Sequence, residues 1–130
     1  MSRKQELEAL TTRWNEAWNS RDPEKLAAFF AADATYYEPN LPSGPVDGKA
    51  GIRTAARQTW DSWPAARFEI VSMTVDDPRV VLEWRSSATH KSGAVVELQG
   101  VDVLEWRGDQ LIAARVYYDE HSRKVALGEA

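Results

Sequence analysis

The first third of the chain carries the hydrophobic repeat of helices. Between residues 3 and 20, apolar side chains recur every three or four positions while charged side chains occupy the other faces, which predicts an amphipathic helix. Asp22, Pro23 and Glu24 then provide a capping side chain, a proline suited to a first helical turn and an acid in that turn. We therefore predict a second, short helix that continues through Phe29 and Phe30.

A strand and a loop precede a third predicted helix. Residues 34–38 have the side chains that strands favour, and Pro39 ends the strand or confines it to an edge because proline has no amide hydrogen. Residues 39–48 are rich in Pro, Gly, Asn and Ser, which is typical of a loop. Asp47 is placed to cap a helix over about residues 49–63, and Pro64 stops it.

From residue 66 onward the pattern changes to an alternation of apolar and polar positions. It predicts strands at about 66–75, 79–89, 94–107 and 110–120, joined by hairpin turns at 76–78, 90–93 and 108–109. In the third of these strands the even-numbered positions are mainly apolar, so we expect that face to point inward. Helices followed by a run of strands indicate an α+β fold, with helices on one side of an antiparallel sheet, as a single domain over residues 1–130.

Composition narrows the possible partners. The 130 residues are 43% hydrophobic, enough to bury a core, and the net charge of −4 is spread along the chain without the basic face that nucleic acid requires. No apolar run approaches the roughly 18 residues of a membrane span, and the polar N-terminus does not resemble a signal peptide. We expect a cytoplasmic protein with no nucleic-acid or membrane partner. With no cysteines, and with His90 and His121 isolated, we expect no metal and no cofactor.

Six tryptophans are more than a core of this size requires. Some of them are therefore predicted to line a cavity, where the indole ring contacts a flat apolar or aromatic ligand and its N–H orients it. The predicted ligand-contacting residues on the inward faces are Trp18, Tyr36, Trp60, Trp84, Leu104, Val116 and Tyr118.

Two acids are candidates for chemistry. Asp102 lies on the inward face of a strand, where a carboxylate must be hydrogen-bonded, paired or protonated. It is either a structural acid satisfied by backbone or tryptophan N–H groups, or a functional acid with a raised pKa. Glu38, where a strand meets the loop, is either a solvated strand-end acid or a general base that points into the cavity. Asp119 is a third candidate.

Several short segments point to a known family. They are Arg13-Trp14-Asn15, Asn19-Ser20-Arg21-Asp22, residues 29–34 (Phe-Phe-Ala-Ala-Asp-Ala), Tyr37-Glu38-Pro39, Gly48 and Ile52-Arg53. With these segments the chain resembles the nuclear transport factor 2-like superfamily, in particular its SnoaL-like polyketide cyclases and ketosteroid isomerases. The resemblance covers nearly the whole chain. It implies a cone-shaped fold, with three N-terminal helices packed on a curved antiparallel sheet that encloses an apolar pocket.

The resemblance also implies roles for particular residues. Glu38 stands where the isomerase has its proton-shuttling aspartate, and Asp102 stands where it has a protonated aspartate that stabilises an oxyanion. Trp14 takes the position of the isomerase's oxyanion-hole tyrosine. In the cyclases an acid in the last strands does the acid/base work, which here is either Asp102 or Asp119.

Two functions follow as hypotheses. The first is a cofactor-free enzyme that transfers a proton at a carbon next to a carbonyl in a flat apolar substrate, with Glu38 as the base and Asp102 and Trp14 polarising the oxygen. The alternative is a ligand-binding or accessory domain of the same fold that does no chemistry. The resemblance further implies a homodimer through the outer sheet face, where Val101, Val103 and Tyr117 are predicted to be exposed.

Overall fold

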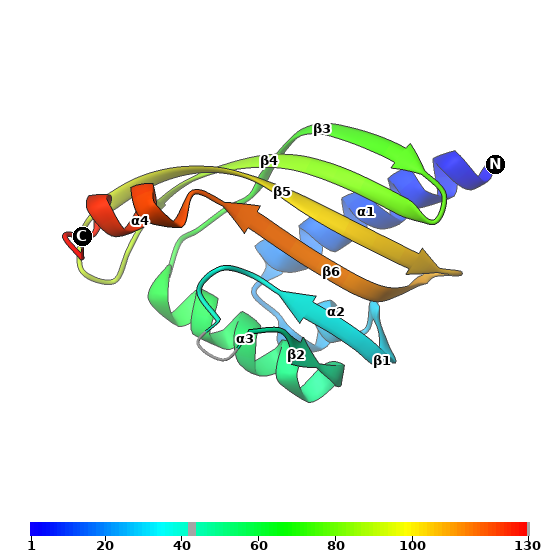
Figure 1. Ribbon diagram of the computed structural model, residues 1–130, viewed down its shortest axis with the longest axis horizontal. Helices are drawn as coiled ribbons and strands as arrows, with labels where there is room; N and C mark the ends of the chain where they lie inside the picture. The colour runs from blue at the N-terminus through cyan, green and yellow to red at the C-terminus, as the bar shows by residue number, and fades with distance from the viewer. Residues whose placement is uncertain (42–43, 130) are drawn as a thin grey trace.

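One six-stranded sheet forms the centre of the computed structural model, which describes residues 1–41 and 44–129 (Figure 1). The strand order is β2-β1-β6-β5-β4-β3. Neighbouring strands are antiparallel, except that β1 and β6 run parallel, so the predicted antiparallel sheet contains one parallel pair. The strands are β1 (Phe30–Tyr37), β2 (Val46–Asp47), β3 (Glu69–Asp76), β4 (Arg79–Thr89), β5 (Val95–Arg107) and β6 (Gln110–Tyr118).

Three N-terminal helices cover one side of this curved sheet, and a fourth helix follows the last strand (Figure 1). The α+β architecture with three N-terminal helices is as predicted, and the C-terminal helix is an addition. The helices are α1 (Arg3–Ser20), α2 (Pro23–Ala27), α3 (Gly48–Ser62) and α4 (Glu120–Ala126).

The helix ends show which local signals determine the structure. The carboxylate of Asp22 accepts hydrogen bonds from two backbone N–H groups of α2, as predicted. That helix ends at Ala27, earlier than expected, because Phe30 pairs with Leu111 of β6 and belongs to a strand. Asp47 holds the N-cap position of α3, but its side chain makes no capping hydrogen bond, which corrects the role given to it.

The strand alternation places the core where the sequence predicts it. On β4 and β5 the even-numbered side chains point inward and are mostly buried, including Leu82, Trp84, Asp102 and Leu104. The largest differences from the predicted strands are that β1 begins at Phe30 rather than at 34, β3 begins at Glu69 rather than at 66 and β6 ends at Tyr118 rather than at 120.

The late start of β3 has a visible cause in α1. The side-chain amide of Asn19 donates to the Phe68 carbonyl at 3.0 Å and accepts from the Phe68 N–H at 2.8 Å. Asn15, one turn earlier, donates to the same carbonyl at 3.0 Å. These bonds take the place of strand pairing at Phe68 and attach the α3–β3 connection to the first helix.

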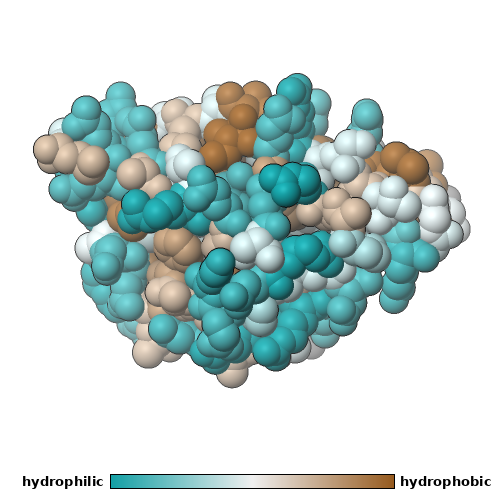
Figure 2. Space-filling model, turned by 180° about the vertical axis from the view of Figure 1, so that it is seen from behind, coloured by the Kyte–Doolittle hydropathy of each residue, from teal (hydrophilic) through white to brown (hydrophobic). Residues whose placement is uncertain are grey.

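The surface seen from behind in Figure 2 is mainly hydrophilic, with hydrophobic side chains in small, separate patches. On the outer sheet face, Tyr117 is 45% exposed and packs against Tyr37, while Val101 and Val103 are half-buried rather than exposed. None of the described helices is long and apolar enough to cross a membrane.

We predict that Asn19→Ala lowers the free energy of unfolding by about 1–3 kcal/mol, because the half-buried N–H of Phe68 loses its partner. Urea denaturation should show a lower midpoint with an unchanged slope. Glu16→Ala, an exposed change on the same helix, is the control. Equal stability of the two variants would contradict this role of Asn19.

Candidate active site

A cavity of about 90 Å³ opens between α1, α3 and the inward face of the sheet. One water needs about 10–15 Å³ of such space, so the cavity has room for a small organic molecule. Its two ends differ in chemistry. One end carries the carboxyl groups of Glu38 and Asp102 with two tyrosine hydroxyls, and the other is walled by Trp63, Ala66, Ala88, Val96 and Leu98.

Asp102 lies in the wall of the cavity with only 6% of its surface exposed. Both carboxyl oxygens accept indole N–H groups: Oδ1 from Trp84 at 2.8 Å and Oδ2 from Trp14 at 3.4 Å. Burial disfavours the charged form and raises the pKa of Asp102 to about 7, although the two N–H groups oppose this shift. Near neutral pH this acid is therefore present in both its protonated and its ionised form.

The two oxygens of Asp102 are not equivalent. The 2.8 Å bond from Trp84 holds Oδ1 as an acceptor, whereas the 3.4 Å contact from Trp14 is long for an N–H···O bond. Oδ2 is therefore the more weakly held oxygen and keeps more capacity for a further hydrogen bond. The predicted structural and functional interpretations of Asp102 are thus compatible, since tryptophans satisfy the same carboxyl group whose pKa burial raises.

Gly100 makes the short bond from Trp84 possible. It lies directly opposite Trp84 in the β4–β5 ladder. A Cβ atom at this position would overlap Cζ2 of the indole and lie 2.6 Å from Cε2. The indole therefore lies across β5 in space that any other residue would fill, and from there its N–H reaches Asp102.

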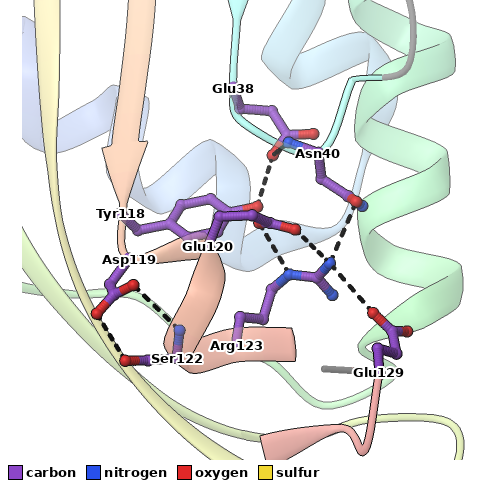
Figure 3. Close-up of polar contacts among 8 residues, drawn as sticks. All are labelled: Glu38, Asn40, Tyr118, Asp119, Glu120, Ser122, Arg123 and Glu129. Atoms are coloured by element: carbon purple, nitrogen blue, oxygen red, sulfur yellow. Dashed lines mark hydrogen bonds and ion pairs between the residues drawn. The ribbon is translucent and has the colours of Figure 1, made fainter. Parts of the chain in front are cut away.

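Glu38 also lines the cavity and is 9% exposed. Its Oε2 accepts the Tyr118 hydroxyl at 2.8 Å and the Asn40 N–H at 3.1 Å (Figure 3). Within residues 1–41 and 44–129, Oε1 accepts no hydrogen bond and is free to take a proton. Burial raises the pKa of Glu38, and the bonds from Tyr118 and Asn40 partly offset that increase.

The C-terminal helix contributes a residue that the sequence analysis did not identify. Arg123 of α4 lines the cavity, is 6% exposed and donates to the Asn40 side chain at 3.3 Å. Its Nε and Nη2 also bind both oxygens of Glu120, at 3.0 and 2.6 Å (Figure 3). A sequence signal for this helix exists, because Asp119 caps it through the Ser122 N–H.

Five of the predicted ligand-contacting residues line the cavity: Trp18, Tyr36, Trp84, Val116 and Tyr118. Trp60 and Leu104 instead pack in the buried core, and the Trp60 indole donates to the Trp18 carbonyl at 3.1 Å. Trp14 also lies in the core and reaches the site only through Asp102. Lining residues that the sequence analysis missed include Asn15, Asn40, Trp63, Phe68, Ser86 and Arg123.

Asp119 lies outside the cavity. Its carboxylate is exposed and accepts the Ser122 N–H and hydroxyl, and these bonds lower the pKa of Asp119 (Figure 3). Of the two alternatives for an acid in the last strands, Asp102 is the one that faces the cavity. Across the described residues, no three His, Asp or Glu side chains gather as metal ligands would.

Comparison with protein-family models matches residues 11–114 to the SnoaL-like domain. The chain belongs to the SnoaL-like family. This membership and the fold confirm the nuclear transport factor 2-like resemblance. Comparison with curated protein sequences found no match.

Solved structures share the fold of this SnoaL-like domain at low sequence identity. A protein from Catenulispora acidiphila with a ketosteroid isomerase-like fold, in complex with trimethylamine, has a TM-score of 0.83 and 23% identity, over 93% of each chain. IdmH, a putative polyketide cyclase from Streptomyces antibioticus, has a TM-score of 0.79 and 18% identity, over 93% of this chain and 97% of its own. A putative isomerase from Bacillus subtilis has a TM-score of 0.83 and 16% identity, over 100% of this chain and 98% of its own.

We predict that Asp102→Asn changes how stability depends on pH. The folded pKa of about 7 lies above the usual value of about 3.9, so the folded state binds more protons than the unfolded state between these values. Wild-type stability should therefore fall relative to Asp102→Asn by on the order of 2 kcal/mol between about pH 5 and pH 8. Urea denaturation at both pH values measures this difference in the free energy of unfolding. The control is Asp109→Asn, in an exposed turn, whose stability should change with pH as that of the wild type does.

We predict that Gly100→Ala displaces the Trp84 indole, lowers stability by about 1–3 kcal/mol and raises the pKa of Asp102 above its wild-type value. Carboxyl-carbon NMR of Asp102 and thermal melting measure the two effects. In a Trp84→Ala background the same change should have little further effect, because the ring that it meets is gone. A full additional loss there would show that Gly100 acts by some other route.

Proposed function

We propose that this SnoaL-like domain is a cofactor-free enzyme that transfers a proton at a carbon next to a carbonyl in a flat, apolar substrate. One observation carries the proposal: two buried carboxyl groups, Glu38 and Asp102, line the same cavity and have different hydrogen-bond partners. Two acids in different surroundings can divide the work, one as an ionised base and one as a protonated donor.

The proton path begins at Glu38. Its unbonded Oε1 takes the proton from the carbon next to the carbonyl, and the electron pair of that C–H bond shifts to form a C=C bond as the carbonyl oxygen becomes an enolate. Asp102, protonated at Oδ2, donates a hydrogen bond to that oxygen. In an isomerisation Glu38 then returns the proton at another carbon. In a cyclisation the enolate carbon attacks a second carbonyl, the π electron pair of that carbonyl moves to its oxygen, and this oxygen takes the proton back from Glu38.

Trp14 has a different part in this proposal from the one expected. Its indole N–H donates to Asp102 and not into the cavity, so it holds and orients the acid that polarises the substrate. Trp84 does the same from the other side while also lining the cavity. Both are positioning residues for Asp102.

The rest of the cavity favours an uncharged ligand. Aromatic side chains form much of its wall, including Trp18, Phe68 and Trp84. Among the described lining residues Arg123 is the one cation, and Glu120 pairs with it. The structures of similar fold that are named as a putative polyketide cyclase and a putative isomerase are in keeping with the proposed type of reaction.

The alternative is a domain that binds such a ligand without chemistry. It is favoured by the indole bonds to both oxygens of Asp102, which satisfy the acid as a purely structural role requires. Independently of this choice, we propose a homodimer through the outer sheet face, where Tyr117 is exposed and Val101 and Val103 are half-buried.

We predict that Glu38→Gln reduces carbon-bound proton exchange by on the order of a hundredfold or more, because the base is lost. Ligands would first be found by thermal shift among steroids, aromatic polyketides and phenols. Exchange into D₂O at the carbon beside the carbonyl of each ketone ligand is then followed by NMR. Glu97→Gln, on the exposed face of β5, is the control and should exchange at the wild-type rate. Tight binding with no exchange in the wild type would support the non-catalytic alternative.

A further inference from the structure

The Tyr36 hydroxyl is a polar group in the cavity that the proposed proton path does not use. The residue is 3% exposed and its side chain lines the cavity. Its hydroxyl makes no hydrogen bond in the part of the chain that the structure describes, whereas that of Tyr118 donates to Glu38 at 2.8 Å. Among the described residues, the fully enclosed side-chain polar atoms without a hydrogen-bond partner belong to Thr11, Arg53 and Trp106, and not to Tyr36. The Tyr36 hydroxyl therefore has open space beside it in the cavity, where a ligand oxygen can be its acceptor.

The position of this hydroxyl is fixed by the surrounding packing. Tyr36 and Glu38 are two residues apart at the end of β1, and both side chains line the cavity. The Tyr36 ring packs against Trp18 and Phe30, with centroids 6.1 and 6.4 Å away. A rigid ring held by strand and core presents its hydroxyl at one place, which is what a hydrogen-bond donor to a bound ligand requires.

A second donor beside Asp102 would complete the proposed oxyanion site. An oxyanion is usually stabilised by more than one preorganised donor, and removing one of them typically slows a reaction by on the order of a hundredfold to a thousandfold. The Trp14 N–H is already engaged with Asp102, so it is not available for the ligand. Tyr36 lines the same cavity as Asp102, and its hydroxyl has no hydrogen-bond partner among residues 1–41 and 44–129.

We propose that the Tyr36 hydroxyl donates a hydrogen bond to an oxygen of the ligand, together with Asp102, and that the ligand is a planar ketone or phenol and not a hydrocarbon. The binding part of this inference stands on the cavity geometry. The catalytic part, in which Tyr36 stabilises the enolate oxygen, rests on the function proposed above. In that step Tyr36 keeps its proton and only donates a hydrogen bond, so the proton still moves between carbon and Glu38.

The electrostatic surroundings suit a donor that stays protonated. Burial raises the pKa of Tyr36 well above its usual value, and the nearby Glu38 and Asp102 carboxyl groups raise it further. The phenol therefore remains neutral throughout the pH range in which Asp102 titrates. A ligand oxygen meets one permanent donor, Tyr36, and one donor that is present only while Asp102 is protonated.

The test compares two flat probes that differ by one oxygen, 2-naphthol and naphthalene, using calorimetry and tryptophan fluorescence. Tyr36→Phe should weaken 2-naphthol binding on the order of tenfold to a hundredfold and leave naphthalene binding unchanged. The matched control is Tyr37→Phe, since the neighbouring Tyr37 packs on the outer face against Tyr117. Melting temperatures of both variants check that the fold is retained.

Three outcomes would overturn the proposal: equal losses for the two probes in Tyr36→Phe, no loss for 2-naphthol, or a wild type that prefers naphthalene. The exchange experiment separates this result from the proposed function. Selective loss of 2-naphthol binding without wild-type exchange would leave Tyr36 as a binding residue in a non-catalytic domain. Exchange that persists in Tyr36→Phe at the wild-type rate would keep the enzyme and remove Tyr36 from its mechanism.

Discussion

The burial of the Asp102 carboxyl group is the constraint on which the rest of the site depends. A carboxyl group in an apolar core is tolerated only when its oxygens find donors or its charge is removed, and here both happen. Two tryptophans from different elements supply the donors, and burial raises the pKa of Asp102 to about 7. The indole rings that fill this small core therefore also provide the hydrogen-bond donors that the buried carboxyl group needs.

The two acids differ in their surroundings, and therefore in the chemistry that each can do. Asp102 is surrounded by indole rings and is held far from solvent, whereas Glu38 accepts a tyrosine hydroxyl and a backbone N–H near the loop and α4. Hydrogen bonds to one oxygen of Glu38 favour its ionised form, while the other oxygen stays open. The β4–β5 pair and the end of β1 therefore place a potential donor and a potential base around a single small cavity.

Much of the fold could be predicted because its longest elements have strong hydrophobic periods. The alternation along β5 is long enough to place Asp102 on the inward face, and α1 shows its apolar side over five turns. The elements that were wrong or missed depend on distant contacts. Phe30 joins a strand by pairing with β6, and β3 starts late because α1 binds Phe68. The helix α4 was missed for another reason, because its seven residues are too few to show a clear helical period.

The site was predictable in its residue types but not in its pairings. Trp14 and Trp84 are 88 and 18 residues from Asp102, so no spacing rule could connect either of them to this acid. Gly100 is a further case, because nothing in a single strand shows that its missing side chain makes room for an indole on the next one. Positions 84 and 100 therefore share one volume. Over evolutionary time they should change as a pair, with a larger residue at 100 accompanied by a smaller one at 84.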